Sequence, residues 1–217
     1  MAVTAPVKPL LRGHIHQATF FIALGSSAML IAKSSSSGTK AVVSTIIYSF
    51  TLLLLFGISA LYHRPQWNEK NRKIMKRLDH AAIFMIIAGS CLPICVLGLG
   101  GALGTKLIML ILIACSLGML KEILWIRSPK WVSATLYVAV GWTIIPFSAQ
   151  LLAGLGTVNF SLLLGGGILY TLGATFYAMK RPNFYPNIFG YHELFHTFVV
   201  IAAACHFILI YRIVTTC

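Results

Sequence analysis

The stretch "AVVSTIIYSFTLLLLFGISALYH", residues 41–63, contains no lysine, arginine, aspartate or glutamate. A helix of this length extends roughly 35 Å at about 1.5 Å per residue, and the hydrocarbon core of a bilayer is about 30 Å thick. We therefore predict a membrane-spanning helix that ends at His63. Pro65 follows two residues later and discourages continuation of the helix.

Six further apolar segments have a similar length, and they place the seven predicted spans at 15–33, 41–63, 79–98, 102–120, 131–152, 160–179 and 191–212. The chain is 58% hydrophobic and 10% charged, whereas soluble domains are usually about a quarter charged. The connections are short, so we predict one all-α membrane domain over residues 1–217 with no separate soluble domain. We also expect no removable signal peptide, because the N-terminus lacks a short apolar core with a cleavage site.

Lysines and arginines are distributed unevenly between the two sides of this arrangement. Thirteen of the 17 fall on the side of the N-terminus: Lys8, Arg12, Arg64, Lys70, Arg72, Lys73, Lys76, Arg77, Lys121, Arg127, Lys130, Lys180 and Arg181. The other four are Lys33, Lys40, Lys106 and Arg212. The positive-inside rule therefore predicts a multi-pass cell (inner or plasma) membrane protein with a cytoplasmic N-terminus and an external C-terminus. The net charge of +13 then favours anionic lipid headgroups as partners, and no nucleic acid.

This topology brings polar residues from three spans to the cytoplasmic end. His63 ends the second span, Asp79 begins the third, and His192 and His196 lie in the first turns of the seventh. The last two are four residues apart, so they share a helix face and can bind one ion. Zinc takes histidine nitrogens, and a catalytic site has three protein ligands plus water. His63 is the natural third ligand, since ionisable residues within spans are rare and usually functional.

Other polar residues lie near this set. Ser59 precedes His63 by four residues and faces the same way, and Asp79 is the sole aspartate, suited to accept a proton from a metal-bound water. His14 and His16 are on the cytoplasmic side, near enough to approach the site. Taken singly, each has a simpler reading, because helix-end histidines are often interfacial and a serine in a span often bonds its own backbone.

The motif "HELFH" at 192–196 also matches the H-E-x-x-H signature of zinc proteases, in which Glu193 would be the general base. No acidic residue follows Glu193 to supply a third ligand, and Glu193 lies about 100° around the helix from His192. We expect Glu193 to face the loop or the headgroups, and Glu122 at another helix end to be solvated. His206, deeper on the last span, is expected to make an interhelical hydrogen bond.

Three stretches resemble the hemolysin III family, the bacterial branch of the progestin and adipoQ receptor (PAQR) proteins: "SALYH" at 59–63, "RLDHAAIFMIIAGSCLP" at 77–93 and "FGYHELFHTFVVIAAACHF" at 189–207. The resemblance covers essentially the whole chain. It implies seven helices with a cytoplasmic N-terminus, in agreement with the charge distribution. It also implies a Zn²⁺ site in which His63, His192 and His196 fall at the ligand positions, Asp79 where an aspartate holds the metal-bound water, and Ser59 beside it.

Three functions are compatible with this resemblance. The wider group includes alkaline ceramidases, which implies zinc-dependent hydrolysis of a ceramide-like lipid amide with Asp79 and Ser59 as catalytic residues. The second is non-catalytic regulation of membrane fluidity or energetics with a structural zinc. The third, implied by the hemolysin name, is a membrane-damaging or pore-forming activity, although no span has a polar stripe suited to a water-filled channel. Hormone recognition, as in the receptor members, is not expected, and the sequence leaves the oligomeric state open.

Overall fold

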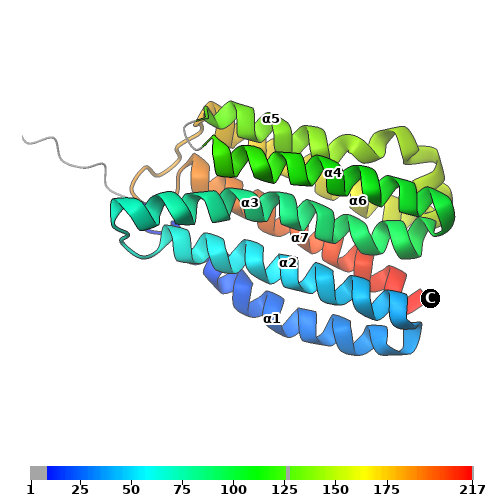
Figure 1. Cartoon of the computed structure of the whole chain (residues 1–217). Helices are drawn as coiled ribbons and strands as arrows, with labels where there is room; N and C mark the ends of the chain where they lie inside the picture. The colour runs from blue at the N-terminus through cyan, green and yellow to red at the C-terminus, as the bar shows by residue number, and fades with distance from the viewer. Residues whose placement is uncertain (1–8, 126–127, 217) are drawn as a thin grey trace, which may run out of the picture.

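The computed structural model describes residues 9–125 and 128–216, and this part of the chain is all-α (Figure 1). The helices are α1 (His14–Ser34), α2 (Thr39–His63), α3 (Glu69–Pro93), α4 (Gly101–Leu124), α5 (Lys130–Gly141), α6 (Ser148–Met179) and α7 (Tyr191–Thr216). Short 3-10 and π segments join or extend them: η1 (Ser35–Ser37), η2 (Ile94–Leu99) and η3 (Trp142–Phe147). An isolated bridge between Tyr185 and Phe189 is the sole β pairing among the described residues. The predicted loop cations Lys8 and Arg127 lie outside them.

Six helical segments of the described chain are long and apolar enough to cross a membrane, whereas the sequence predicted seven spans. The difference lies in Lys130–Met179, whose 50 residues form a nearly continuous run of α5, η3 and α6. A straight helix of that length would extend about 75 Å. Instead, the backbone leaves helical geometry at Gly156, with φ 74° and ψ 164°, values open mainly to glycine. Trp142 Nε1 donates to Thr171 Oγ1 at 2.8 Å, so residues on the two sides of Gly156 pack together and the run folds back on itself (Figure 1).

The third helix begins ten residues earlier than predicted, at Glu69 rather than at Asp79. Asn68 caps it, because the side-chain oxygen of Asn68 accepts a hydrogen bond from the Asn71 amide at 2.8 Å. Glu69 in the first turn also suits the positive end of the helix dipole. The basic residues between 70 and 77 therefore occupy helical turns, and the hydropathy of the sequence marks only where this helix becomes apolar.

Close contact between helices depends on small residues, and large apolar side chains face outward. A Cβ added at Gly89 of α3 would lie 2.0 Å from the Thr51 hydroxyl of α2, and one at Gly118 of α4 would lie 2.2 Å from the Phe84 ring of α3. Close approach at small residues is typical of packing between membrane helices. The outer surface exposes many side chains such as Ile22, which is 71% exposed. Such a surface is unusual in water and suits contact with lipid.

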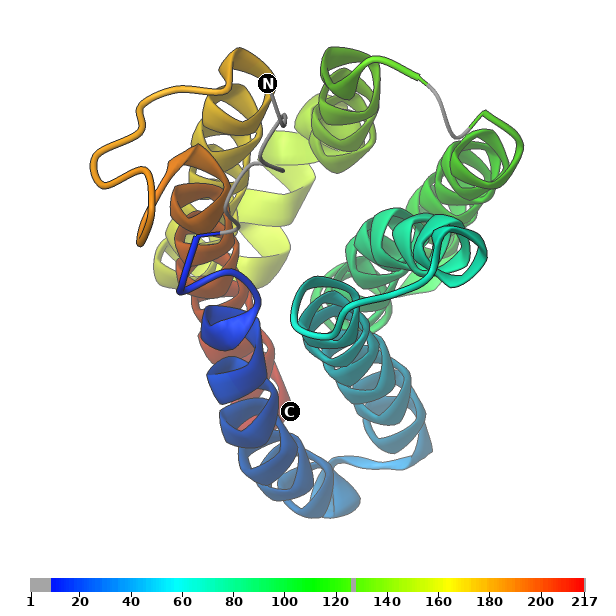
Figure 2. The ribbon, with the colours of Figure 1, turned by 90° about the vertical axis from the view of Figure 1, so that its left-hand side faces the viewer.

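One end of the bundle, shown end-on in Figure 2, gathers the segments that build the site. There α2 ends, α3 and α7 begin, and residues 9–13 cross from α1 towards the loop that precedes α7. We name residues 9–13 the N-terminal strap. Within it, the amides of Leu10 and Leu11 donate to the carbonyls of Asn187 and Ile188, at 2.9 and 3.2 Å.

Candidate metal centre

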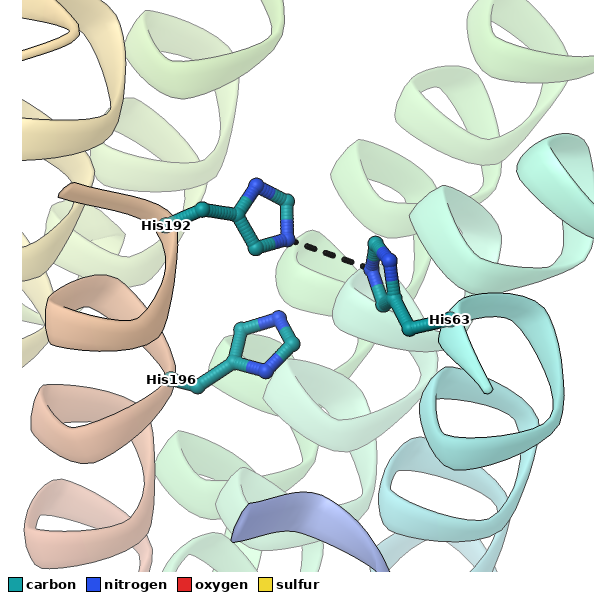
Figure 3. Close-up of side chains that lie close together, drawn as sticks. All are labelled: His63, His192 and His196. Carbon is teal, nitrogen blue, oxygen red and sulfur yellow. Dashed lines mark hydrogen bonds between the residues drawn. The ribbon is translucent and has the colours of Figure 1, made fainter. Parts of the chain in front are cut away.

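The side chains of His63, His192 and His196 lie close together at this end of the bundle (Figure 3). His63 is the last residue of α2, and the other two occupy the first turns of α7, where their spacing puts them on one face. The Nε2 atoms of His63 and His192 are 3.2 Å apart, and the ring centroids of His192 and His196 are 4.6 Å apart. One ligand atom from each histidine lies within 4.8 Å of the other two, and all three residues are buried. The structure thus brings together the three residues that the sequence singled out.

This donor set fits a zinc ion. Two nitrogens bound tetrahedrally at 2.0–2.1 Å from zinc would be about 3.3 Å apart, and the observed separation of the His63 and His192 nitrogens is 3.2 Å. The three residues come from two helices, so the cluster needs the folded bundle. In the described ranges, no other group of three or more histidines, cysteines or carboxylates is placed to hold a metal ion.

Asp79 and Ser59 lie beside the histidines, as the sequence predicted. The Asp79 carboxylate is 3.7 Å from His63 Nε2, which is longer than a direct hydrogen bond. Ser59, one turn before His63 on α2, is buried and lines the same cavity as Asp79. Asp79 lies well inside α3 because that helix begins at Glu69, so the carboxylate is held by a regular helix rather than by a terminus.

Comparison with known proteins agrees with this architecture. The sequence profile of the family described as Haemolysin-III related matches residues 4–207. The chain belongs to the haemolysin III family. The resemblance predicted from the three motifs is therefore confirmed, and the protein is a membrane protein with several transmembrane helices.

Bacterial and animal relatives of this haemolysin III family member share most of its length. It is 34% identical over 180 residues to the protein named Hemolysin-3 of Bacillus cereus, which covers 82% of this chain and 79% of that protein. It is 32% identical over 166 residues to the Hemolysin-3 homolog of Bacillus subtilis (strain 168), covering 76% and 75%. The Progestin and adipoQ receptor-like protein 1 of Caenorhabditis elegans is 29% identical over 182 residues, which span 75% of this chain and 42% of that protein.

Glu193, between the two α7 histidines, faces the loop that precedes α7, which is one of the two expected alternatives, and it does not reach the headgroups. Its side chain is fully buried. Oε1 accepts a hydrogen bond from Arg12 Nε at 2.5 Å, and Oε2 accepts one from the Gly190 amide at 2.9 Å. Arg12 belongs to the N-terminal strap, so a cation distant in the sequence compensates the buried carboxylate. Glu193 therefore anchors the strap to α7. Its buried ion pair with Arg12 argues against a role as general base.

Glu122 of α4 was expected to be solvated, and that expectation was wrong, because the residue is buried. Its carboxylate lies 3.2 Å from His80 Nδ1, 2.9 Å from Lys121 Nζ and 3.3 Å from the Tyr137 hydroxyl. These partners come from α3, α4 and α5, so this polar cluster connects three helices of the family member. The adjacent pair Lys121–Glu122 was the sole local signal for it, and such pairs are common at solvated helix ends.

A mainly apolar cavity leads from the histidines into the bundle. Ser59 and Asp79 line it near the cluster, Ile87 lines it farther along, and His206 lines its deep part. The Nε2 atom of His206 donates to the Leu163 carbonyl of α6 at 3.3 Å, which confirms the predicted interhelical hydrogen bond. The cavity gives an apolar chain a path to the polar end of the site.

Of the two N-terminal histidines, only His16 reaches the site. His14 is exposed. The His16 ring stacks on the His196 ring, with centroids 3.8 Å apart and an angle of 7° between the planes. Phe56 contacts His16 edge-on at 5.1 Å. The sequence placed His16 on the correct side of the membrane domain but gave no reason to prefer it over His14.

Proposed function

We propose that this haemolysin III family member binds one zinc ion through His63, His192 and His196 and uses the site to hydrolyse a lipid amide in the plasma membrane. The observation that carries the proposal is the meeting of three buried imidazoles within 4.8 Å, beside a carboxylate and a serine. Three histidine ligands leave a fourth position for water or substrate, as in catalytic zinc sites.

The membrane arrangement that we propose has seven crossings and a cytoplasmic N-terminus. The fold-back of Lys130–Met179 at Gly156 supports counting that segment as two crossings. The strap and the basic turns that follow residue 68 lie at one end, and the C-terminal end of α7 lies at the other (Figure 1). By the positive-inside rule, the basic end faces the cytoplasm.

Labelling of single cysteines with a membrane-impermeant maleimide tests this arrangement. In a cysteine-free background, Ser36→Cys should react in intact cells, and Asn68→Cys should react only after the membrane is permeabilised. Both positions are exposed in the structure. Equal reaction of the two variants in intact cells would contradict the proposed topology.

Different residues of the chain would carry out different parts of the hydrolysis. A bound zinc ion would polarise the substrate carbonyl and make water a stronger acid. Asp79 is placed to accept a proton from a water beside His63, and Ser59, which lines the same cavity, would help to orient that water. The apolar cavity would take the acyl chain, which favours a lipid with a single chain next to the amide.

Two measurements test the metal and the reaction separately. Purified protein should contain about one zinc per chain, and His196→Ala should lose most of it, because two histidines hold zinc less well than three. Asp79→Asn should keep the metal and lose at least about 10²-fold in fatty-acid release from ceramide-like lipids, the lower bound for a general base. His14→Phe, at an exposed position, is the matched control for both.

The regulator hypothesis predicts a different result from the same samples. If zinc is structural, zinc-loaded wild type should release no fatty acid from a broad lipid panel, and His196→Ala should unfold at a lower temperature. Equal release from wild type, Asp79→Asn and zinc-stripped protein would also remove hydrolysis from the proposal.

A further inference from the structure

His16 combines complete burial with unused hydrogen-bonding groups. Its residue exposure is 2%, and neither Nδ1 nor Nε2 has a hydrogen-bond partner in the described part of the chain. Burying a polar nitrogen without a partner is unfavourable. His16 also lines the cavity, together with Ser59, Asp79 and His196. The His16 ring is therefore part of the wall of this cavity.

The geometry of the ring stack argues against His16 as a fourth metal ligand. The lone pair of an imidazole nitrogen lies in the plane of its ring, and the rings of His16 and His196 are nearly parallel, 3.8 Å apart. An ion in the plane of the His196 ring would lie roughly one stacking distance outside the plane of the His16 ring. His16 is thus a neighbour of the cluster, one ring layer away, rather than a member of it.

A purely steric role does not explain the residue type. Phenylalanine could stack on His196 and meet Phe56 edge-on as well, without burying two polar nitrogens. A neutral imidazole also carries one N–H donor and one acceptor nitrogen. What histidine adds over phenylalanine at this position is hydrogen bonding towards something bound in the cavity.

We infer that His16 is a ligand-binding residue, whose ring N–H donates a hydrogen bond to an oxygen of a carboxylate or hydroxamate group bound beside the histidine cluster. The inference rests on the proposed metal site and adds a recognition group that the three ligands do not provide. The oxygen-bearing group can belong to a lipid or to a small acid, because the recognition chemistry is the same.

The test uses Co²⁺ in place of zinc, because its visible absorption reports the ligands around the metal. Full-length protein in detergent is loaded with Co²⁺, and acetohydroxamate and decanohydroxamate are titrated in while the spectrum is followed. Wild type is compared with His16→Phe and His16→Leu, which lose the hydrogen bond, and with His16→Gln, which keeps an N–H donor. His14→Phe is the exposed control.

We expect all variants to bind Co²⁺ like wild type, and His16→Phe and His16→Leu to bind both hydroxamates about tenfold more weakly. His16→Gln should stay within about threefold of wild type. Decanohydroxamate should bind more tightly than acetohydroxamate in every variant if the lipid chain enters the cavity, with the same relative loss at position 16. His16→Leu keeps the comparison available if His16→Phe does not fold.

Two results would overturn the inference. Equal hydroxamate affinity in wild type, His16→Phe and His16→Leu would leave His16 as a stacking residue while the metal site stands. Absence of Co²⁺ binding in wild type would remove the metal site and this inference with it. The Co²⁺ content of each sample therefore distinguishes failure of the inference from failure of the proposed function.

Discussion

Replacing Arg12 with methionine should be among the most destabilising single changes at the basic end of the bundle. The change keeps much of the side-chain stem but removes the guanidinium, so the buried Glu193 carboxylate loses its contact with Arg12 Nε at 2.5 Å and with Nη2 at 3.4 Å. Among the described residues, only the Gly190 amide would still donate to it. Breaking a buried ion pair by removing one partner costs about 3–5 kcal/mol. The Arg12 side chain is 21% exposed, so water can partly compensate, and we expect a loss near the lower end of that range, about 3 kcal/mol.

The measurement is the free energy of unfolding in mixed detergent and SDS micelles, followed by helical circular dichroism. A double-mutant cycle with Glu193→Gln isolates the pair from other effects of the strap. Because Glu193→Gln removes the charge that Arg12 compensates, the double variant should recover at least about half of the loss. Arg181→Met, at an exposed position after α6, is the control for removal of an arginine.

The reasoning would be refuted by an Arg12→Met variant whose unfolding free energy lies within about 0.5 kcal/mol of wild type, the range of ordinary surface substitutions. It would also fail if the losses of the two single variants added without coupling. In that case the contact in the structure would not contribute measurably to stability.

Further substitutions test packing and the second polar cluster. Gly166→Ala should destabilise the protein by about 1–3 kcal/mol, because the new Cβ would lie 2.5 Å from the His206 ring, whereas Gly165→Ala, with no atom within 4 Å, should be neutral or slightly stabilising in the same thermal assay. Glu122→Ala should cost about 2–4 kcal/mol because it leaves the buried donors of His80 and Tyr137 unpaired. If Glu122→Ala leaves the zinc content of the protein unchanged, the Glu122 cluster is structural and does not contribute to the metal site.

The sequence predicted the elements that depend on local hydropathy. The spans at 41–63 and 191–212 end or begin within a few residues of α2 and α7, so hydropathy and charge alone sufficed to place the two α7 histidines and His63 at one end of the bundle. Their meeting follows from the order of crossings and from the i, i+4 spacing, both of which are local. The fold-back at Gly156 falls between the predicted spans 131–152 and 160–179, although the helix there resumes without a loop.

The sequence did not predict interactions between residues that lie far apart in the chain. Glu193 was expected at the loop or the headgroups rather than in a buried ion pair, because its compensating cation is 181 residues away in the strap. Glu122 was expected to be solvated because its partner His80 is 42 residues away. A hydropathy value is assigned to each residue by itself. It therefore does not include the favourable interaction of a charged residue with a partner on another helix. The early start of α3 was missed for a related reason, since basic turns capped by Asn68 are helical but not apolar.

The contact between Arg12 and Glu193 also sets an order of events during synthesis. Arg12 is synthesised 181 residues before its partner Glu193, which lies near the start of α7. Until Glu193 is made the strap cannot dock, because the carbonyls of Asn187 and Ile188 that accept its amides are equally late. The basic end of the bundle, including the N-terminal strap, is therefore completed only after the start of α7 has been translated. A nascent chain stalled before residue 187 would expose the unfinished end to proteases, and release of the full-length chain would protect it.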